Sequence, residues 1–167
     1  MIAAAVIAAF PLLMAFAASS DLLTMRISNG LALSVTLLFF VVALWVQMPF
    51  EQLALHTGLA CIVLVVGFAF FAFGWIGGGD AKLAAATVLW VGLGQLLPYL
   101  IYAALLGGAL TLALLAVRRW PLPAALAQVG WIDRLHDSKS GVPYGVALAA
   151  SAILVYSRTD IFQHLVG

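Results

Sequence analysis

The chain has 167 residues, of which 66% are hydrophobic and 8% are charged. Because a typical soluble domain has about 25% charged residues, this composition excludes a soluble globular protein and predicts an integral membrane protein. The formal net charge of +1 gives no indication of a nucleic-acid partner, and the single cysteine, Cys61, excludes a disulfide within the chain. With no long polar stretch, we expect one membrane-embedded domain over residues 1–167.

The apolar stretches predict an all-α fold, a bundle of about six transmembrane helices. A helix that spans a bilayer needs about 20 mostly apolar residues. The expected spans are 2–20, 30–48, 53–75, 81–96, 98–117 and 142–157. The first is interpreted as a retained span and not as a cleaved signal peptide, because no basic segment precedes it.

The division between the fourth and fifth spans rests on length. As one helix, residues 81–117 would be about 55 Å long, whereas the apolar core of a bilayer is about 30 Å thick. We therefore expect two spans here, joined by a tight turn near Gln95 to Pro98.

The basic residues predict the orientation. With six spans, the segments 21–29, 76–82 and 118–141 lie on one side of the membrane, and both termini lie on the other. Six of the seven Lys and Arg residues fall in these three segments, and only Arg158 falls on the other side. The six are Arg26, Lys82, Arg118, Arg119, Arg134 and Lys139. By the positive-inside rule these segments face the cytoplasm, and both termini lie outside.

Two acidic residues stand at span ends on the predicted cytoplasmic side. Asp21 follows the first span, and Asp80 opens the fourth within the sequence GWIGGGDAKL. Ionisable residues at such positions often face a bundle interior or a water-filled cavity. If two carboxylates come close together, they share a proton, so that one can act as a base toward water while the other polarises a peptide carbonyl. Asp133 and Asp137 are expected to be solvated charges in the long loop.

Alternative interpretations of the two aspartates stay open. In a structural one, Asp80 caps the fourth helix and pairs with Lys82, while Asp21 pairs with Arg26. Lys82 could instead anchor the helix start near the lipid headgroups. In a functional alternative, Asp21 and Asp80 are proton or cation relay sites of a non-catalytic membrane component. A relay needs polar groups through the depth of the bilayer, however, and the middles of the spans are apolar.

Two further features lead to structural expectations. His56, a lone imidazole near the outer end of the third span, is expected to hydrogen-bond to a neighbouring helix. Gly107 and Gly108 in the fifth span are expected to permit close helix contact. The spacing of the histidines predicts no metal site.

The glycine-rich sequence GGGDAKL resembles the GxGD motif of membrane-embedded aspartyl proteases, with Gly77, Gly79 and Asp80 in the motif positions. Glycines without Cβ atoms, Gly78 included, would let a substrate backbone approach closely.

Two other motifs resemble those of the type IV prepilin peptidase family. In SSDLLTMRISNGL, the residues that match the first aspartate motif of that family are Asp21, Arg26, Ile27 and Asn29. Ser28 stands where the family usually has proline. The sequence GVPYGVALA, residues 141–149, resembles the start of the last helix of the family.

The resemblance implies a membrane aspartic-type endopeptidase of the bacterial inner membrane, which removes the short basic leader from type IV prepilins at the cytoplasmic face. Asp21 and Asp80 would be the catalytic pair. The supporting residues would be Gly77, Gly78, Gly79, Lys82, Arg26 and Asn29. The implied partners are a prepilin or pseudopilin substrate and the lipid bilayer, and no cofactor or metal is expected.

Larger members of the family carry an N-terminal insertion with four cysteines and also methylate the new pilin N-terminus. This chain has one cysteine and no such insertion. It therefore resembles the short, peptidase-only branch that serves Flp/Tad-type pili, and methyltransferase activity is not expected.

Overall fold

The computed structural model describes residues 2–166, with side chains from Ala4 onward. Its helices are α1 (Ile2–Thr24), α2 (Asn29–Trp45), α3 (Phe50–Ala72), α4 (Gly78–Val117), α5 (Ala124–Ala127), α6 (Gly130–His136), α7 (Tyr144–Tyr156) and α8 (Asp160–Val166), with a 3₁₀ turn, η1, over Ser138–Ser140. No strand occurs within residues 2–166, so the predicted all-α class is confirmed. The prediction that both termini lie outside the cell concerns Met1 and Gly167, and these two residues are not among those that the structure describes.

Several of these helices have the length and composition of membrane spans. Within the described chain, α1, α3 and α4 are each long and apolar enough to cross a bilayer. The pair α7 and α8, bent by 49° where they meet, adds a fourth span if it is counted as one. The apolar helix α2 is shorter, with 17 residues. The chain is therefore a helical membrane protein, as the composition predicted.

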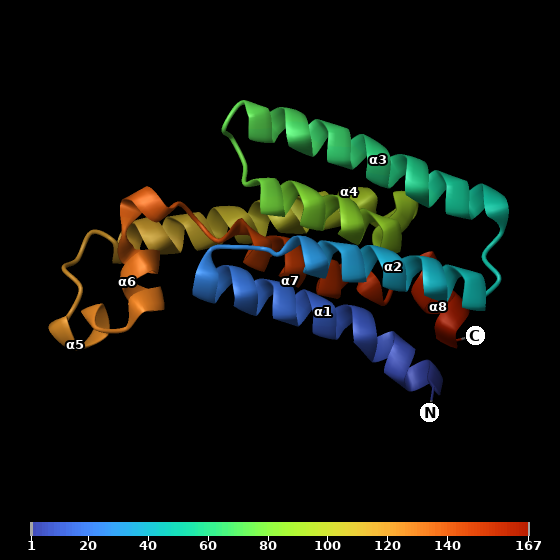
Figure 1. Ribbon diagram of the computed structural model, residues 1–167, viewed down its shortest axis with the longest axis horizontal. Coiled ribbons are helices and arrows are strands. Elements are labelled where there is room, and N and C mark those ends of the chain that lie inside the picture. The colour runs from blue at the N-terminus through green and yellow to red at the C-terminus, as the bar shows by residue number, and fades with distance from the viewer. Residues whose placement is uncertain (1, 167) are drawn as a thin grey trace.

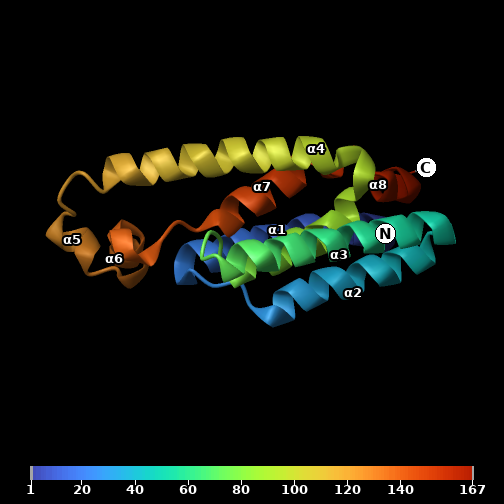
Figure 2. The same cartoon turned by 90° about the horizontal axis from the view of Figure 1, so that it is seen from above.

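Helix α4 reverses within its length, so that its two halves run in opposite directions (Figure 2). The break lies at Gly92, whose dihedral angles are φ 65° and ψ 179°, and it separates arms at 78–91 and 93–117. The predicted division into two segments is thus right, but the predicted turn at Gln95 to Pro98 is wrong, since both residues are helical. Positive φ with extended ψ is a conformation that only glycine adopts readily, and this places the break at Gly92.

His56 of α3 lies against this break. Its side chain is buried, and Nδ1 lies 2.6 Å from the carbonyl oxygen of Leu89, near the end of the first arm. The last four carbonyls of a helix have no partner within the helix, so the imidazole satisfies one of them. The ring occupies the space beside Gly92, where an added Cβ would lie 2.6 Å from Cε1 of His56. The predicted hydrogen bond from His56 to a neighbouring helix is confirmed.

Gly92→Ala is expected to lower the thermal stability of the protein. The substitution forces a Cβ into a glycine-only conformation, at a cost of about 1–3 kcal/mol, and it also displaces the buried His56 ring. Thermal unfolding of the purified protein in detergent measures the effect. Gly94→Ala is the matched control, because a Cβ at Gly94 meets nothing within 4 Å. Equal melting temperatures for the two variants would contradict the prediction.

The core is built around Trp90 in the first arm of α4. Its buried ring stacks on Phe10 of α1, with centroids 4.7 Å apart, and meets Phe39 of α2 and Tyr156 of α7 edge-on at 5.9 and 6.3 Å. Its indole nitrogen donates to the carbonyl oxygen of Val35 at 3.0 Å. One residue therefore joins four helices and sets how the first arm of α4 lies against α1, α2 and α7.

The helices lie lengthwise, so their ends gather at two ends of the bundle (Figure 1). The end of α1, the start of α4 and the helix α6 lie at one end, whereas the N- and C-terminal regions lie toward the other. The segments predicted to share one side of the membrane are thus together in the structure. This arrangement brings Asp21 and Asp80 to the same end of the bundle.

Candidate active site

Asp21 lies in the last turn of α1, and only 5% of its surface is exposed. Its Oδ2 accepts a 2.8 Å hydrogen bond from the amide of Gly145, in the first turn of α7. The first amides of a helix lack partners within the helix, so a carboxylate is well placed there. A Cβ at Gly145 would lie 2.8 Å from the same carboxylate oxygen. Glycine at this position therefore leaves room for the Asp21 carboxylate beside the amide.

Asp80 lies in the first turn of α4, three residues after the N-cap residue Gly77. Oδ2 of Asp80 lies so close to Gly77 that an added Cβ at Gly77 would be 2.9 Å from it. The carboxylate of Asp80 thus lies near the start of the helix, where the helix dipole favours negative charge. The structural role considered for Asp80, as the helix cap, is wrong, because Gly77 is the N-cap residue and no side chain caps this helix by a hydrogen bond. Asp80 instead lines a cavity.

Both carboxylates line one cavity of about 550 Å³. Its walls come from two segments, the end of α1 with its loop to α2 and the GGGD turn. The lining residues are Ser20, Asp21, Thr24, Met25, Arg26, Ile27, Ser28, Asn29, Gly77, Gly78, Gly79 and Asp80. We call this space the acid cavity. It brings together the two predicted catalytic residues and every predicted supporting residue except Lys82.

Ile27 and Gly145 contribute to this site, although the sequence analysis gave neither a role. A Cβ at Gly79 would lie 3.1 Å from Cβ of Ile27, and a Cβ at Gly145 would lie 2.6 Å from its Cδ1. Ile27 is thus held between the GGGD turn and the start of α7. Gly145 belongs to the motif GVPYGVALA, which is recognisable in the sequence. The sequence does not show, however, that its amide donates a hydrogen bond to Asp21.

Lys82 lies beside the acid cavity and is directed toward α2. Its Nζ donates a 2.8 Å hydrogen bond to Oδ1 of Asn29, which ties the start of α4 to the start of α2. The pairing with Asp80 considered from the sequence is therefore replaced by a pairing with Asn29. Arg26 is exposed, and its backbone carbonyl accepts hydrogen bonds from the hydroxyls of Ser20 at 3.0 Å and Thr24 at 3.2 Å. These bonds hold the loop that forms one wall of the cavity.

The start of α7 is held by the second arm of α4. The Tyr144 hydroxyl donates to the carbonyl oxygen of Ala103 at 3.3 Å, and its ring lies so close to Gly107 that an added Cβ would overlap it. The predicted close contact is confirmed at Gly107, but it is wrong for Gly108, where a Cβ meets nothing within 4 Å. Because Tyr144 precedes Gly145, this packing positions the amide that reaches Asp21.

The long loop after α4 closes over the same end of the bundle. Nη1 of Arg134 in α6 donates to the carbonyl oxygen of Leu23 at 2.9 Å, which fastens α6 to the end of α1. Arg118 donates to the carbonyl oxygens of Leu135 and Gly141 at 2.6–3.0 Å. The predicted solvated acids of this loop, Asp133 and Asp137, are both exposed.

Comparisons with known proteins give one match. The model of the type IV leader peptidase family matches residues 8–112, which is more than half of the chain and includes both walls of the acid cavity. Searches of curated proteins and of solved structures gave no match. Among residues 2–166, no three His, Cys, Asp or Glu side chains are grouped as metal ligands would be.

Proposed function

This chain belongs to the type IV leader peptidase family, and we propose that it is an aspartic endopeptidase in which Asp21 and Asp80 cut the leader from type IV prepilins. The observation that carries the proposal is the acid cavity, in which both carboxylates face one space whose walls are two short motifs. A hydrolase that uses two carboxylates needs them on one cavity that admits a peptide and a water molecule. Asp21 and Asp80 both line the acid cavity, although they are far apart in the sequence.

In the proposed reaction the two carboxyl groups share one proton, because two neighbouring carboxylates do not both ionise easily. The ionised member takes a proton from water, and the resulting nucleophile attacks the scissile carbonyl carbon. The protonated member donates a hydrogen bond to the carbonyl oxygen as negative charge develops there. When the C–N bond breaks, the carboxyl group that took the proton from water gives it to the leaving amine, and the pair returns to its starting state of one ionised and one protonated member.

The glycines of the GGGD turn suit the binding of a peptide backbone. Gly78 and Gly79 open α4, so their amides belong to the first turn, which has no acceptors within the helix. Neither residue has a side chain of its own beside these amides, although Phe71 and Ile27 pack close to the turn. In the proposed complex they hold the peptide beside Asp80.

Co-expression with candidate type IV prepilins tests the function, with leader removal scored as a gel shift. The expected result is conversion of at least one precursor to its mature size. We place the chain in the peptidase-only branch that serves Flp/Tad-type pili, so mass spectrometry of the product is expected to show an unmethylated N-terminus. If no precursor is processed by the expressed and inserted protein, the proposal is wrong, and a relay function would become the better explanation.

The proposed active site faces the cytoplasm, where the prepilin leader lies. Topology reporters fused after Arg26, Lys82 and Lys139 are expected to read cytoplasmic, because most of the basic residues lie in these segments. Reporters fused after Glu51 and at the C-terminus are expected to read external. An external signal after Lys82, together with a cytoplasmic signal after Arg26, would put the two acids on opposite faces and contradict the proposal.

A further inference from the structure

Another hollow adjoins the acid cavity at the loop after α1. Its volume is about 560 Å³, and its lining residues are Leu23, Thr24, Met25, Arg26 and Arg134. Three of them, Thr24, Met25 and Arg26, also line the acid cavity, so the two spaces meet at this segment. Arg134 comes from α6, which packs against the end of α1 (Figure 1). We call this space the arginine hollow.

The arginine hollow presents two guanidinium groups from separate elements. Arg26 and Arg134 are both exposed, and no acidic residue is among the described residues that line the hollow. Nη1 of Arg134 donates to the carbonyl oxygen of Leu23 at 2.9 Å, which holds this guanidinium at the hollow. Because a guanidinium has five N–H donors, others remain able to bind an anion. Two such forks on one space suit a group with several charged oxygen atoms, and phosphate is such a group.

The face of α1 that leads to the arginine hollow is apolar and exposed. Its large side chains, Leu12, Phe16 and Leu23, recur at a spacing that puts them on one side of the helix, whereas Phe10 and Met14 on the opposite side are buried. Because α1 has the length and composition of a membrane span, this exposed face meets lipid acyl chains. Leu23 belongs both to the face and to the hollow, so the face ends at the two guanidinium groups.

Two exposed tryptophans indicate the depth of the arginine hollow in the membrane. Trp131 lies in the first turn of α6, three residues before Arg134, and Trp120 follows the end of α4. Tryptophan side chains are enriched at the boundary between acyl chains and headgroups. Arg134 is therefore at the depth at which lipid phosphates lie.

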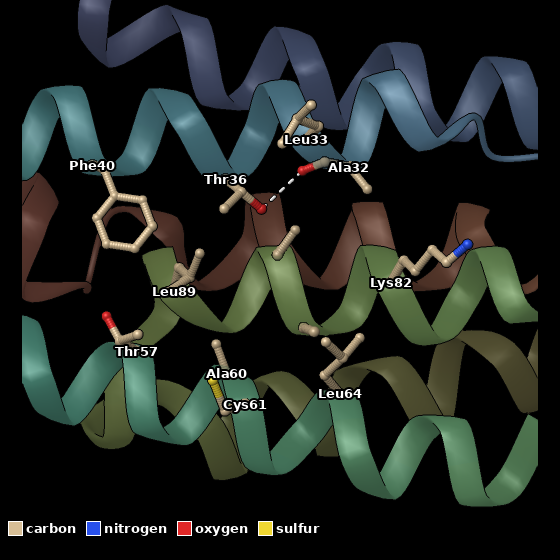
Figure 3. A pocket seen from close by; sticks show the side chains of 12 residues that line it. Ala32, Leu33, Thr36, Phe40, Thr57, Ala60, Cys61, Leu64, Lys82 and Leu89 are labelled. Carbon is tan, nitrogen blue, oxygen red and sulfur yellow. Dashed lines mark hydrogen bonds between the residues drawn. The ribbon is translucent and has the colours of Figure 1, made fainter.

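The hollow between α2 and α3 lacks this combination of features. The charged residue among those that line it is Lys82 (Figure 3). Its ammonium already donates to Oδ1 of Asn29 at 2.8 Å. A single cation that is engaged in this way offers an anion less than two guanidinium groups do.

We propose that the arginine hollow binds the phosphate of an anionic phospholipid whose acyl chains lie along the exposed face of α1. A free phosphate would meet the same guanidinium groups, but it would leave the apolar face that leads to them without a ligand. A zwitterionic lipid brings a cation beside its phosphate, and the two arginines repel that cation. The bound phosphate joins the loop after α1 to α6, and it does so beside the acid cavity. This site is separate from peptide cleavage, so lipid binding is measured without a peptide substrate.

Native mass spectrometry of the purified protein in a neutral detergent tests the site. The probe is dioleoyl phosphatidylglycerol, and dioleoyl phosphatidylcholine, with the same acyl chains, is the comparison. Phosphatidylglycerol is expected to bind about tenfold more tightly, because arginines near a membrane surface attract anionic headgroups. Glycerol 3-phosphate carries the phosphate without acyl chains, and it is expected not to bind at the same concentrations.

Two variants and a matched control locate the site. Arg134→Gln and Arg26→Gln are each expected to weaken the binding of phosphatidylglycerol about tenfold, because each removes charge-assisted hydrogen bonds to the phosphate. Arg119→Gln removes the same charge from an exposed residue that does not line the hollow, and it is expected to change the affinity little. Arg26→Gln also keeps the bond from Arg134 to Leu23, and the loop is held through the backbone carbonyl of Arg26. This variant therefore tests the site without loosening α6.

The outcomes distinguish the lipid from other ligands. Absence of binding, equal affinities for the two lipids, or a loss in Arg119→Gln as large as in Arg26→Gln overturns the site. Binding of glycerol 3-phosphate as tight as that of phosphatidylglycerol overturns the lipid and makes a free phosphate the ligand. Leader cleavage is scored separately by co-expression, so failure of the lipid site leaves the proposed function standing, and the reverse also holds.

Discussion

Asp21→Asn and Asp80→Asn are each expected to abolish leader cleavage while the protein remains inserted and expressed. Asparagine keeps the volume of the side chain, and at position 21 its amide oxygen can still accept the hydrogen bond from Gly145. It cannot take a proton from water, however, so the chemical step fails. Loss of one member of a catalytic unit costs on the order of 10⁴–10⁶ in kcat, which puts cleavage below detection in a gel assay. The double variant is expected to be little worse than either single one.

Two acids of the long loop supply matched controls for this experiment. Asp133→Asn and Asp137→Asn remove exposed carboxylates at the same end of the bundle, so they are expected to cost far less activity. Processing assays on the four single variants, with immunoblots for expression, decide the outcome. Substantial cleavage by the Asp80→Asn protein would rule out the aspartyl mechanism. A loss at Asp133 as large as the loss at Asp80 would mean that the catalytic pair is a different one.

Gly145→Ala is expected to lower kcat by about 100-fold, the cost of misplacing a reacting group by about 1 Å. The added Cβ would lie 2.8 Å from Oδ2 of Asp21 and 2.6 Å from Cδ1 of Ile27. Both atoms are at the ends of side chains, so the side chains move and the backbone packing is kept. The carboxylate of Asp21 is therefore displaced from the Gly145 amide, while the thermal stability changes little.

The measurement for this variant pairs cleavage kinetics with thermal unfolding. Gly130→Ala, at the start of α6, is the control, because a Cβ there meets nothing within 4 Å. Cleavage by Gly145→Ala at the unaltered rate would show that the hydrogen bond from Gly145 to Asp21 has no part in catalysis. A parallel loss of stability and activity would instead give Gly145 a role in the packing of α1 against α7.

The position of the turn within α4 could not be predicted from the local sequence. The length of the apolar run required a reversal, because one helix of that length exceeds the bilayer thickness. Pro98 and Gln95 were plausible positions on local grounds, yet Gly92 takes the reversal. Its conformation is matched by His56 of α3, which fills the adjacent space and binds the carbonyl of Leu89. That partner is 33 residues away from Leu89 in the chain, so no local pattern could identify it.

The sequence by itself determined the membrane class and the all-α fold, and it contains the two acid motifs. The reason is physical: in a bilayer a long apolar segment satisfies its backbone hydrogen bonds as a helix, so composition and length suffice. Only the tertiary structure decided which groups meet. The hydrogen bond from the Gly145 amide to Asp21, the pairing of Lys82 with Asn29 and the acid cavity each depend on how separate helices pack. The sequence states which side chains exist, but the packing of α1, α4 and α7 decides which of them face one another.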